Sequence, residues 1–247
     1  MKILVVAPHD DDAILGAGGA IVRHINKGDS VSVVVFTTGH TSHQIVLGIT
    51  ENPSPDEVAQ KRREEILTAM MWLGVPVGNL YFLEIPTREV RARSEEAEKK
   101  LRKIFTVVKP DVVYFNHMDA HSDHKGVNRV VKAILRDTPA AKPYQFMIWT
   151  KELAAGRPEM EQSDIPEVSG GNVRVVTLSE KEKILKRRAL YEMKSQVSLW
   201  PYPEWQVQDR PILDPPFIRH FLVGGEVFVS YEIPHTIVLS DVLLERV

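Results

Sequence analysis

Short apolar runs alternate with amphipathic stretches along the chain, and this alternation predicts strands that are each followed by a helix. The run at 3–7 (ILVVA) is rich in β-branched residues, as are strands that are buried on both faces. Apolar residues then recur at helical spacing over 13–27, and Gly28 with Asp29 supplies a stop signal. A second apolar run covers 30–39, so the N-terminal segment predicts a strand–helix–strand unit.

The rest of the chain continues this alternation after one polar interruption. Residues 41–56 are polar and punctuated by prolines, which predicts a surface loop. A capping box of Ser179 and Glu182 marks the start of one of the later helices. Further helices are expected at 57–73, 89–109, 125–137 and 179–193. Further strands are expected at 79–85, 111–116, 144–149 and 172–178, with a C-terminal hairpin over 219–232 around Gly224 and Gly225.

These elements predict one domain over residues 1–247. Strands that alternate with helices are typical of a Rossmann-like three-layer α/β fold. We expect its sheet to be mostly parallel, with an antiparallel edge at the C-terminus.

Composition and charge narrow the classes of partner and of site. The formal net charge is −2, which gives no electrostatic reason to expect a nucleic acid or an anionic membrane as partner. No apolar stretch reaches the roughly 18 residues of a membrane span, and the apolar start is too short for a signal peptide, so we expect a cytoplasmic protein. The chain has no cysteine, so any metal site must be built from imidazole and carboxylate ligands.

Two polar clusters follow predicted parallel strands. The first is HDDD at 9–12, and the second contains the histidines of DAHSDH at 119–124. Ligands collect at the carboxyl ends of strands in such sheets, so the two clusters should lie close together. Each holds a pair of potential ligands three residues apart, which one helical stretch would place on a common side. Together the clusters can close a metal site with a position left open for water. The pairs are His9 with Asp12 and His121 with His124.

The residues of the two clusters suggest different roles. If Asp12 binds the metal, its neighbour Asp11 must point elsewhere, which suits a general base, and Asp10 could then face solvent. In the second cluster one histidine can be the third ligand, while the other stabilises an oxyanion or protonates a leaving amine, oriented by Asp123. Either cluster alone would be more typical of a solvated helix N-terminus, and the pair together favours the metal site.

The glycine-rich stretch after the first cluster does not match a dinucleotide-binding motif. The spacing of Gly16, Gly18 and Gly19 departs from G-x-G-x-x-G, and the neighbouring aspartates would repel a pyrophosphate. We interpret these glycines as sites of close helix packing.

The two clusters resemble the motifs of a known family. APHDDDAILGAGG resembles the HPDDE…GxGG signature of the LmbE-like, or PIG-L, zinc-dependent N-acetylglucosamine deacetylases, and DAHSDH resembles the HxDH element of that family. RREEILTAMMWLGV, KSQV and GGEVFVSYE resemble later elements in the same order. The resemblance implies a hydrolase that uses metal-activated water to remove the N-acetyl group of an amino sugar.

The resemblance also assigns roles to residues. Asp11 matches the general base, and His121 matches the histidine that stabilises the tetrahedral intermediate, with Asp123 as its orienting partner. The zinc ligands of the family fall on His9, Asp12 and His124.

The likeness extends to one substrate contact and shows three departures. The arginine that contacts the sugar in this family matches Arg62, and Arg63 is the alternative candidate for that role. Asp10 stands where the family has proline, Ala13 where it has glutamate, and Thr87 where it often has an aspartate. Neither Asp10 nor Ala13 replaces an assigned ligand or base.

Several alternatives stay open on the sequence alone. The aromatic residues Trp200, Tyr202 and Trp205 could stack on sugar rings or could form a packing loop or a subunit contact. The loop histidines His40 and His43 are expected to be surface residues. Two histidines and one carboxylate suit iron(II), cobalt or nickel as well as zinc.

The function also has alternatives. A metal-dependent amidase that acts on a non-sugar or thiol-conjugate amide would use the same site, and the strand–helix–strand start alone would fit a non-catalytic nucleotide-binding module. The expected partner is a small-molecule amino sugar, with no nucleic acid and no membrane span, and homo-oligomer formation is left open.

Overall fold

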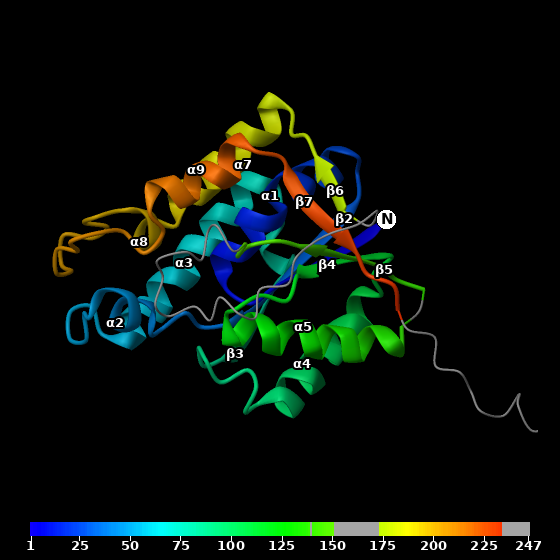
Figure 1. The fold of residues 1–247 in the computed structure, drawn as a ribbon, viewed down its shortest axis with the longest axis horizontal. Helices are drawn as coiled ribbons and strands as arrows, with labels where there is room; N and C mark the ends of the chain where they lie inside the picture. Colours follow the sequence, from blue (N-terminus) through cyan, green and yellow to red (C-terminus); the bar gives the residue numbers. More distant parts are fainter. Residues whose placement is uncertain (139, 151–172, 234–247) are drawn as a thin grey trace, which may run out of the picture.

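A seven-stranded sheet with the order β3-β2-β1-β4-β5-β7-β6 forms the centre of the molecule (Figure 1). We describe it from a computed structural model, which defines residues 1–138, 140–150 and 173–233. The first five strands run parallel, and β7 pairs antiparallel with both β5 and β6, so the predicted sheet type and the antiparallel edge are confirmed. The strands are β1 (Lys2–Ala7), β2 (Ser30–Thr37), β3 (Leu80–Ile85), β4 (Val112–Asn116), β5 (Lys142–Phe146), β6 (Val173–Val176) and β7 (Glu226–Ser230).

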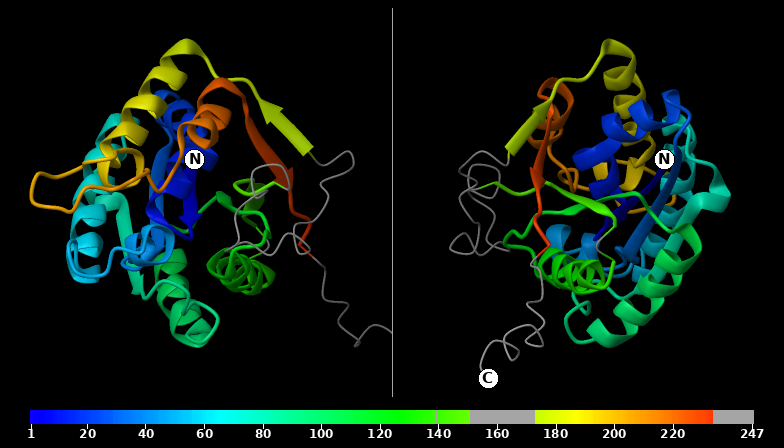
Figure 2. Two further views of the ribbon diagram at one scale, coloured as in Figure 1. Left: turned by 60° about the vertical axis from the view of Figure 1, so that its left-hand side comes forward. Right: turned by 90° about the vertical axis from the view of Figure 1, so that its right-hand side faces the viewer.

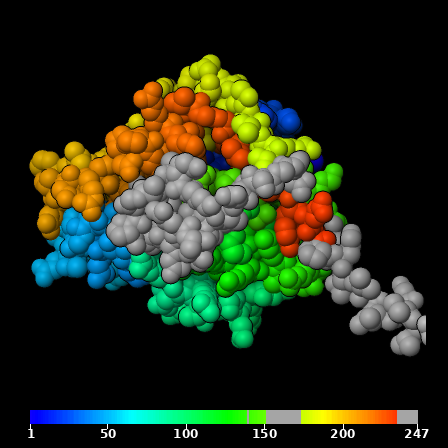
Figure 3. All heavy atoms as spheres, in the orientation of Figure 1, coloured from blue at the N-terminus to red at the C-terminus, as the bar shows by residue number. Residues whose placement is uncertain are grey.

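Helices cover both faces of the sheet. One face packs against α1, α3, α7 and α9, and the other packs against α4 and α5, as two separate apolar clusters show. Figure 2 shows the same separation from two further directions, and in Figure 3 the atoms of α9 and α7 lie at the top and those of α4 and α5 at the bottom. No helix among the described residues is both long and apolar enough to cross a membrane. The helices are α1 (Asp10–Asn26), α2 (Ser42–Leu47), α3 (Pro55–Leu73), α4 (Ser94–Val108), α5 (Ser122–Arg136), α7 (Glu180–Glu192), α8 (Lys194–Val197) and α9 (Pro215–Val223), with a 3-10 turn η1 (Val77–Asn79).

Two helices begin three residues earlier than the sequence analysis predicts. α1 starts directly after His9 and α5 directly after His121, so the acidic residues that seemed to precede each helix form its first turn. Carboxylates are favourable there because they interact with the partial positive charge of the helix N-terminus. His9 and Asp12 also form a reciprocal capping box.

Two other predictions were wrong. The loop at 41–56 contains the short helix α2, and the C-terminal hairpin over 219–232 does not form. Its first half belongs to α9, which Asp214 caps by accepting a hydrogen bond from the backbone N–H of Phe217 at 2.8 Å. Only β7, in its second half, is a strand, and β6 is its antiparallel partner.

The glycines of α1 mark close packing, as predicted. A Cβ atom on Gly16 would lie 2.3 Å from the ring of Phe146 on β5, and one on Gly19 would lie 2.4 Å from Leu178. The backbone N–H of Gly19 also donates to the buried carboxylate of Glu226 at 2.6 Å, so this stretch of α1 is held against β7. Close approach at this point sets how α1 lies on the sheet and thereby where its N-terminus points.

Replacement of Gly16 should therefore destabilise the fold. In Gly16→Ala the added methyl group forces the helix or the Phe146 ring to move, and we expect the free energy of unfolding to fall by about 1–3 kcal/mol. Chemical denaturation measures this difference. Gly78→Ala is the matched control, since nothing lies within 4 Å of an added Cβ there. Equal stability of the two variants would contradict the packing described.

Candidate metal centre

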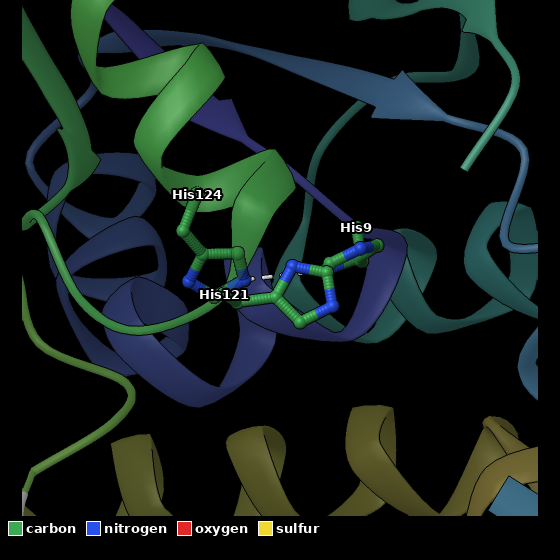
Figure 4. Close-up of side chains that lie close together, drawn as sticks. All are labelled: His9, His121 and His124. Carbon is green, nitrogen blue, oxygen red and sulfur yellow. Dashed lines mark hydrogen bonds between the residues drawn. The ribbon is translucent and has the colours of Figure 1, made fainter. Parts of the chain in front are cut away.

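The two sequence clusters meet at the carboxyl edge of the sheet. β1 and β4 are adjacent parallel strands, and α1 and α5 begin just beyond them. His9 and His121 are the N-cap residues of these helices, while Asp12 and His124 each lie three positions further on. Figure 4 shows the three histidines pointing toward one another from the two helix starts. The structure thus brings together all four residues of the predicted ligand pairs.

Three side-chain atoms form a small triangle. His9 Nδ1 lies 3.0 Å from Asp12 Oδ2, and His124 Nε2 lies 3.1 Å from the same oxygen and 3.3 Å from His9 Nδ1. Ligand atoms on a tetrahedral zinc ion, with bonds of about 2.0–2.2 Å, are separated by roughly 3.3 Å. The donor set and its spacing therefore fit a divalent transition metal. His121 and Asp11 also belong to clusters of ligand atoms within 4.8 Å of one another.

A carboxylate contacts the outer ring nitrogen of each of the two candidate ligand histidines. Asp119 Oδ2 lies 2.7 Å from His124 Nδ1, and Asp123 Oδ2 lies 3.3 Å from His9 Nε2. Histidines that bind metals commonly have such a partner on the other ring nitrogen, which fixes the ring orientation. Asp119 was missed by the sequence analysis, although an acidic residue near a ligand histidine is the signal that could have identified it.

The role expected of Asp123 needs a correction. Its carboxylate accepts hydrogen bonds from His9 and from the backbone N–H of Arg88 at 2.8 Å, and not from the ring of His121. Only the backbone N–H of Asp123 contacts that ring, where it donates to Nδ1 at 3.2 Å. This contact is the N-cap bond of α5, and it turns the carboxylate toward α1.

Burial and nearby charges set different pKa values for the carboxylates and histidines. Burial, followed by the charge of Asp12, raises the pKa of Asp11 to about 6. For Asp12 burial acts in the same direction, but His124 and His9 outweigh it and hold its pKa well below its usual range. Burial and the positive charges of His9 and His124 lower the pKa of His121. Asp12 is therefore ionised and His121 neutral at pH 7.

Asp10 does not face solvent, which corrects the expectation. It is 5% exposed and accepts two hydrogen bonds from the guanidinium of Arg62, one of them from Nε at 2.8 Å. Arg62 is itself 3% exposed, donates from Nη1 to Gln196 at 3.0 Å, and lies 3.8 Å from the carboxylate of Asp11. Gly39 makes room for this guanidinium, since a Cβ there would lie 2.5 Å from Arg62 Nε.

A pocket opens next to the metal centre. The catalytic candidates His9, Asp11, Asp12 and His121 line its inner end, together with Leu15 from the next turn of α1. Four polar or charged residues and seven further apolar residues line the rest. The polar group is Thr41, Ser42, Thr87 and Arg88, and the apolar group is Ile45, Val46, Ile148, Trp149, Ile212, Leu213 and Phe217.

The predicted substrate-binding residues lie elsewhere. Neither Arg62 nor the aromatic residues at 200–205 belong to the described lining of this pocket. Trp205 is 4% exposed and packs edge-on against His43 and Tyr202, while Trp200 is 60% exposed. For Trp205 and Tyr202 the structure shows the packing alternative. His43 is buried and lies 2.9 Å from Gln208, so its expected surface position was wrong.

A buried glutamate anchors the aromatic segment below the site. Glu65 on α3 is 4% exposed and accepts hydrogen bonds from the backbone N–H and the hydroxyl of Ser195, both at 2.6 Å, and from the hydroxyl of Tyr202 at 2.8 Å. Burial raises the pKa of Glu65 to about 7 in spite of these donors. The contacts connect α3, which carries Arg62, to α8 and the segment that follows it.

Fold and site together define a Rossmann-like α/β protein with a His/Asp metal-binding cluster at the carboxyl edge of its sheet. Residues 4–135 match the family described as "PIG-L: GlcNAc-PI de-N-acetylase", and the chain belongs to this family. The matched segment contains both clusters of the metal centre and ends within α5.

Individual relatives agree with this assignment. The chain is 32% identical over 136 residues to a diacetylchitobiose deacetylase of Thermococcus kodakarensis, which covers 52% of this chain and 49% of the relative. It therefore spans about half the length of the curated relatives that it matches.

Solved structures share the fold. An N,N'-diacetylchitobiose deacetylase from Pyrococcus horikoshii has a TM-score of 0.63 and 22% identity, covering 98% of this chain and 88% of that one. A zinc-inhibited form of the teicoplanin deacetylase has a TM-score of 0.64 and 18% identity, covering 93% and 97%.

Removal of the carboxylate behind His124 should weaken metal binding. In Asp119→Ala the imidazole loses the partner that fixes its orientation, and we expect the affinity for zinc to fall by about 10-fold to 100-fold. Competition with a chromogenic chelator measures the affinity. Asp209→Ala, at an exposed position, should bind zinc like the wild type, and equal affinities in both variants would contradict the role given to Asp119.

Glu65 should make stability depend on pH. Its pKa of about 7 in the folded protein lies above the usual value of 4.5, so the unfolded chain loses the proton first as the pH rises between these values. The contribution of Glu65 to the free energy of unfolding should therefore be largest below pH 4.5 and fall by on the order of 3 kcal/mol as the pH passes 7.

Urea denaturation at several pH values tests this expectation against Glu65→Gln, which removes the titrating group. The wild type should lose more stability than this variant between about pH 5 and pH 8. Glu64→Gln is the control, because Glu64 lies on the exposed face of α3 and its pKa is lowered by Lys61. Parallel pH profiles for the wild type and Glu65→Gln would show that Glu65 is ionised throughout.

Proposed function

We propose that the protein is a metal-dependent hydrolase that removes the N-acetyl group from an N-acetylglucosamine-type sugar or conjugate. The observation that carries this proposal is the triangle of His9, Asp12 and His124 atoms beside a pocket that Asp11 and His121 also line. Membership in the PIG-L family, with relatives named as deacetylases, supports an N-acetyl amide as the bond that is cleaved.

We propose zinc as the metal, since two histidines and a carboxylate with an open position are typical of zinc hydrolases. An ion held by these three residues would polarise the amide carbonyl and make a water molecule more acidic. Asp119 and Asp123 would keep the two imidazoles in the orientation that binding requires.

In this proposal Asp11 accepts a proton from the attacking water. It is adjacent in the chain to Asp12 and lines the pocket, and its carboxylate lies within 4.8 Å of ligand atoms of His9 and Asp12, outside the closer triangle of His9, Asp12 and His124. Its pKa of about 6 allows it to be ionised at neutral pH and still to release the proton later.

His121 can stabilise the negative oxygen that develops on the carbonyl. Because its Nδ1 accepts the backbone hydrogen bond of Asp123, the proton of the neutral ring resides on Nε2. This N–H is then a donor beside the pocket, as a group that stabilises an oxyanion must be.

The overall reaction is a hydrolysis. The C–N bond of the amide breaks, and a C–O bond forms with the oxygen of water. Asp11 takes one proton from that water, and the proton is returned to the leaving nitrogen, directly or through His121. The products are acetate and a free amine on the sugar.

Acetate release tests the proposal. Purified protein should liberate acetate from N-acetylglucosamine or N,N'-diacetylchitobiose when loaded with zinc, and a chelator should abolish the activity. Activity that survives complete removal of the metal, or a protein that holds no metal and binds nucleotides, would contradict it.

The base assignment has its own test. Asp11→Asn should still bind zinc, because the ligands are intact, but the amide cannot accept the proton, and kcat should fall by about 100-fold to 10,000-fold. Asp56→Asn, on the exposed first turn of α3, is the control and should match the wild type in both zinc content and kcat. A fully active Asp11→Asn variant would show that another group is the base.

A further inference from the structure

The pocket beside the metal centre has two chemically different sides. Among the described residues, its polar side chains outside the catalytic cluster come from segments that follow β2 or β3, namely Thr41, Ser42, Thr87 and Arg88. Within the described chain, Oγ1 of Thr41 and Oγ1 of Thr87 are buried and have no hydrogen-bond partner. Buried hydroxyl groups are seldom left unpaired, so these two are available to a polar group of a substrate.

The opposite side is apolar. The described lining residues that follow β5 or belong to α9 and the segment before it are Ile148, Trp149, Ile212, Leu213 and Phe217. Each of them is at most 8% exposed, and the rings of Trp149 and Phe217 stack with their centroids 4.6 Å apart. Apart from the indole N–H of Trp149, these side chains carry no group that donates or accepts a hydrogen bond, so they offer little to the hydroxyl groups of a sugar.

The strand order places the metal centre between the two sides. β3 and β2 lie on one side of the β1–β4 pair that carries the ligands, and β5 lies on the other. An amide held at the centre therefore extends in two directions, with the amine moiety toward one side and the acyl moiety toward the other. The amine moiety, a sugar, matches the side with the free hydroxyl groups, although Ile45 and Val46 of α2 also line that side. The acyl moiety then faces the apolar side.

We infer that the substrate carries an apolar N-acyl chain longer than acetyl, which lies on Trp149, Leu213 and Phe217. This inference rests on the proposed metal-dependent hydrolysis of an amino-sugar amide, and it replaces acetyl, as the acyl group that is removed, with a longer chain. The single methyl group of an acetyl amide would cover only the area of the apolar side nearest the metal centre. The reaction itself is unchanged: the amide C–N bond breaks, water supplies the oxygen of the released carboxylate, and the amine keeps the returned proton.

A chain-length series tests the inference. The zinc-loaded protein is assayed with N-acetyl, N-butanoyl and N-hexanoyl glucosamine, and kcat/KM should rise by about fourfold for each methylene that the pocket buries. A kcat/KM that is flat or falls with chain length would overturn the inference and leave the deacetylase proposal intact. Failure to hydrolyse every member of the series would instead contradict the proposed function.

Variants locate the acyl side. Trp149→Ala should lower the ratio of kcat/KM for the hexanoyl substrate to that for the acetyl substrate by about tenfold or more. Because the ratio compares two substrates on the same variant, a smaller fraction of folded protein lowers both kcat/KM values equally and leaves the ratio unchanged. Trp72→Ala is the matched control, because that indole lies on the outer face of α3, bonded to Glu192, and should keep the wild-type ratio. An unchanged ratio in Trp149→Ala would overturn the assignment of the apolar side.

Product binding gives a readout that does not depend on turnover. Calorimetric titration of the zinc-loaded protein with acetate, butanoate and hexanoate should show affinity that increases along the series in the wild type and much less so in Trp149→Ala. Equal affinities for the three carboxylates in the wild type would overturn the inference whatever sugar the enzyme accepts.

Discussion

The concentration of negative charge at the buried start of α1 is the constraint on which the rest of the site depends. Asp10, Asp11 and Asp12 are 5%, 7% and 3% exposed, and adjacent carboxylates in such surroundings need compensating positive charge. Arg62 compensates Asp10, the two ligand histidines or a metal between them compensate Asp12, and the N-terminus of α1 favours all three. Asp11 has the weakest compensation, since Arg62 lies 3.8 Å away, and it is the carboxylate whose pKa rises. Three residues that look equivalent in the sequence thus have different surroundings: Asp10 pairs with Arg62, Asp12 contacts two histidines, and Asp11, the proposed base, has the raised pKa.

The same charge balance connects distant segments of the chain. Arg62 belongs to α3 and donates to Gln196 of α8 as well as to Asp10, and Glu65, one turn further along α3, holds Ser195. A buried ion pair with hydrogen bonds at both ends is costly to break, because removal of one partner leaves an uncompensated charge. The packing of α3 against α1 and α8 is therefore a condition for the position of the carboxylates at the start of α1 and not a separate feature of the fold.

The elements that follow from local sequence could be predicted. β-Branched runs give the parallel strands, and the three-residue spacing in both clusters gives the ligand pairs, because an N-cap residue and the third residue of the first helical turn face the same point. Contacts between remote segments could not be predicted: Arg62 lies 52 residues from Asp10, and no local pattern indicates that they pair. The apolar run at 221–223 is so short that it fits a strand or a helix, and the cap that decides for a helix lies upstream at Asp214.

The buried arginine also affects how a substrate can be recognised. The resemblance to the family implies that this arginine contacts the sugar and that a proline occupies the position of Asp10. Here the guanidinium donates from Nε and Nη2 to Asp10 and from Nη1 to Gln196, and it does not belong to the described lining of the pocket. Asp10 thus holds this guanidinium as a counter-charge within the site. Hydrogen bonds to a substrate must then come from the segments after β2 and β3, where Thr41 and Thr87 hold unpaired hydroxyl groups in the described structure. Arg88 lines that same side of the pocket, so a guanidinium is available there, and apolar contact on the opposite side of the metal centre adds to the binding energy.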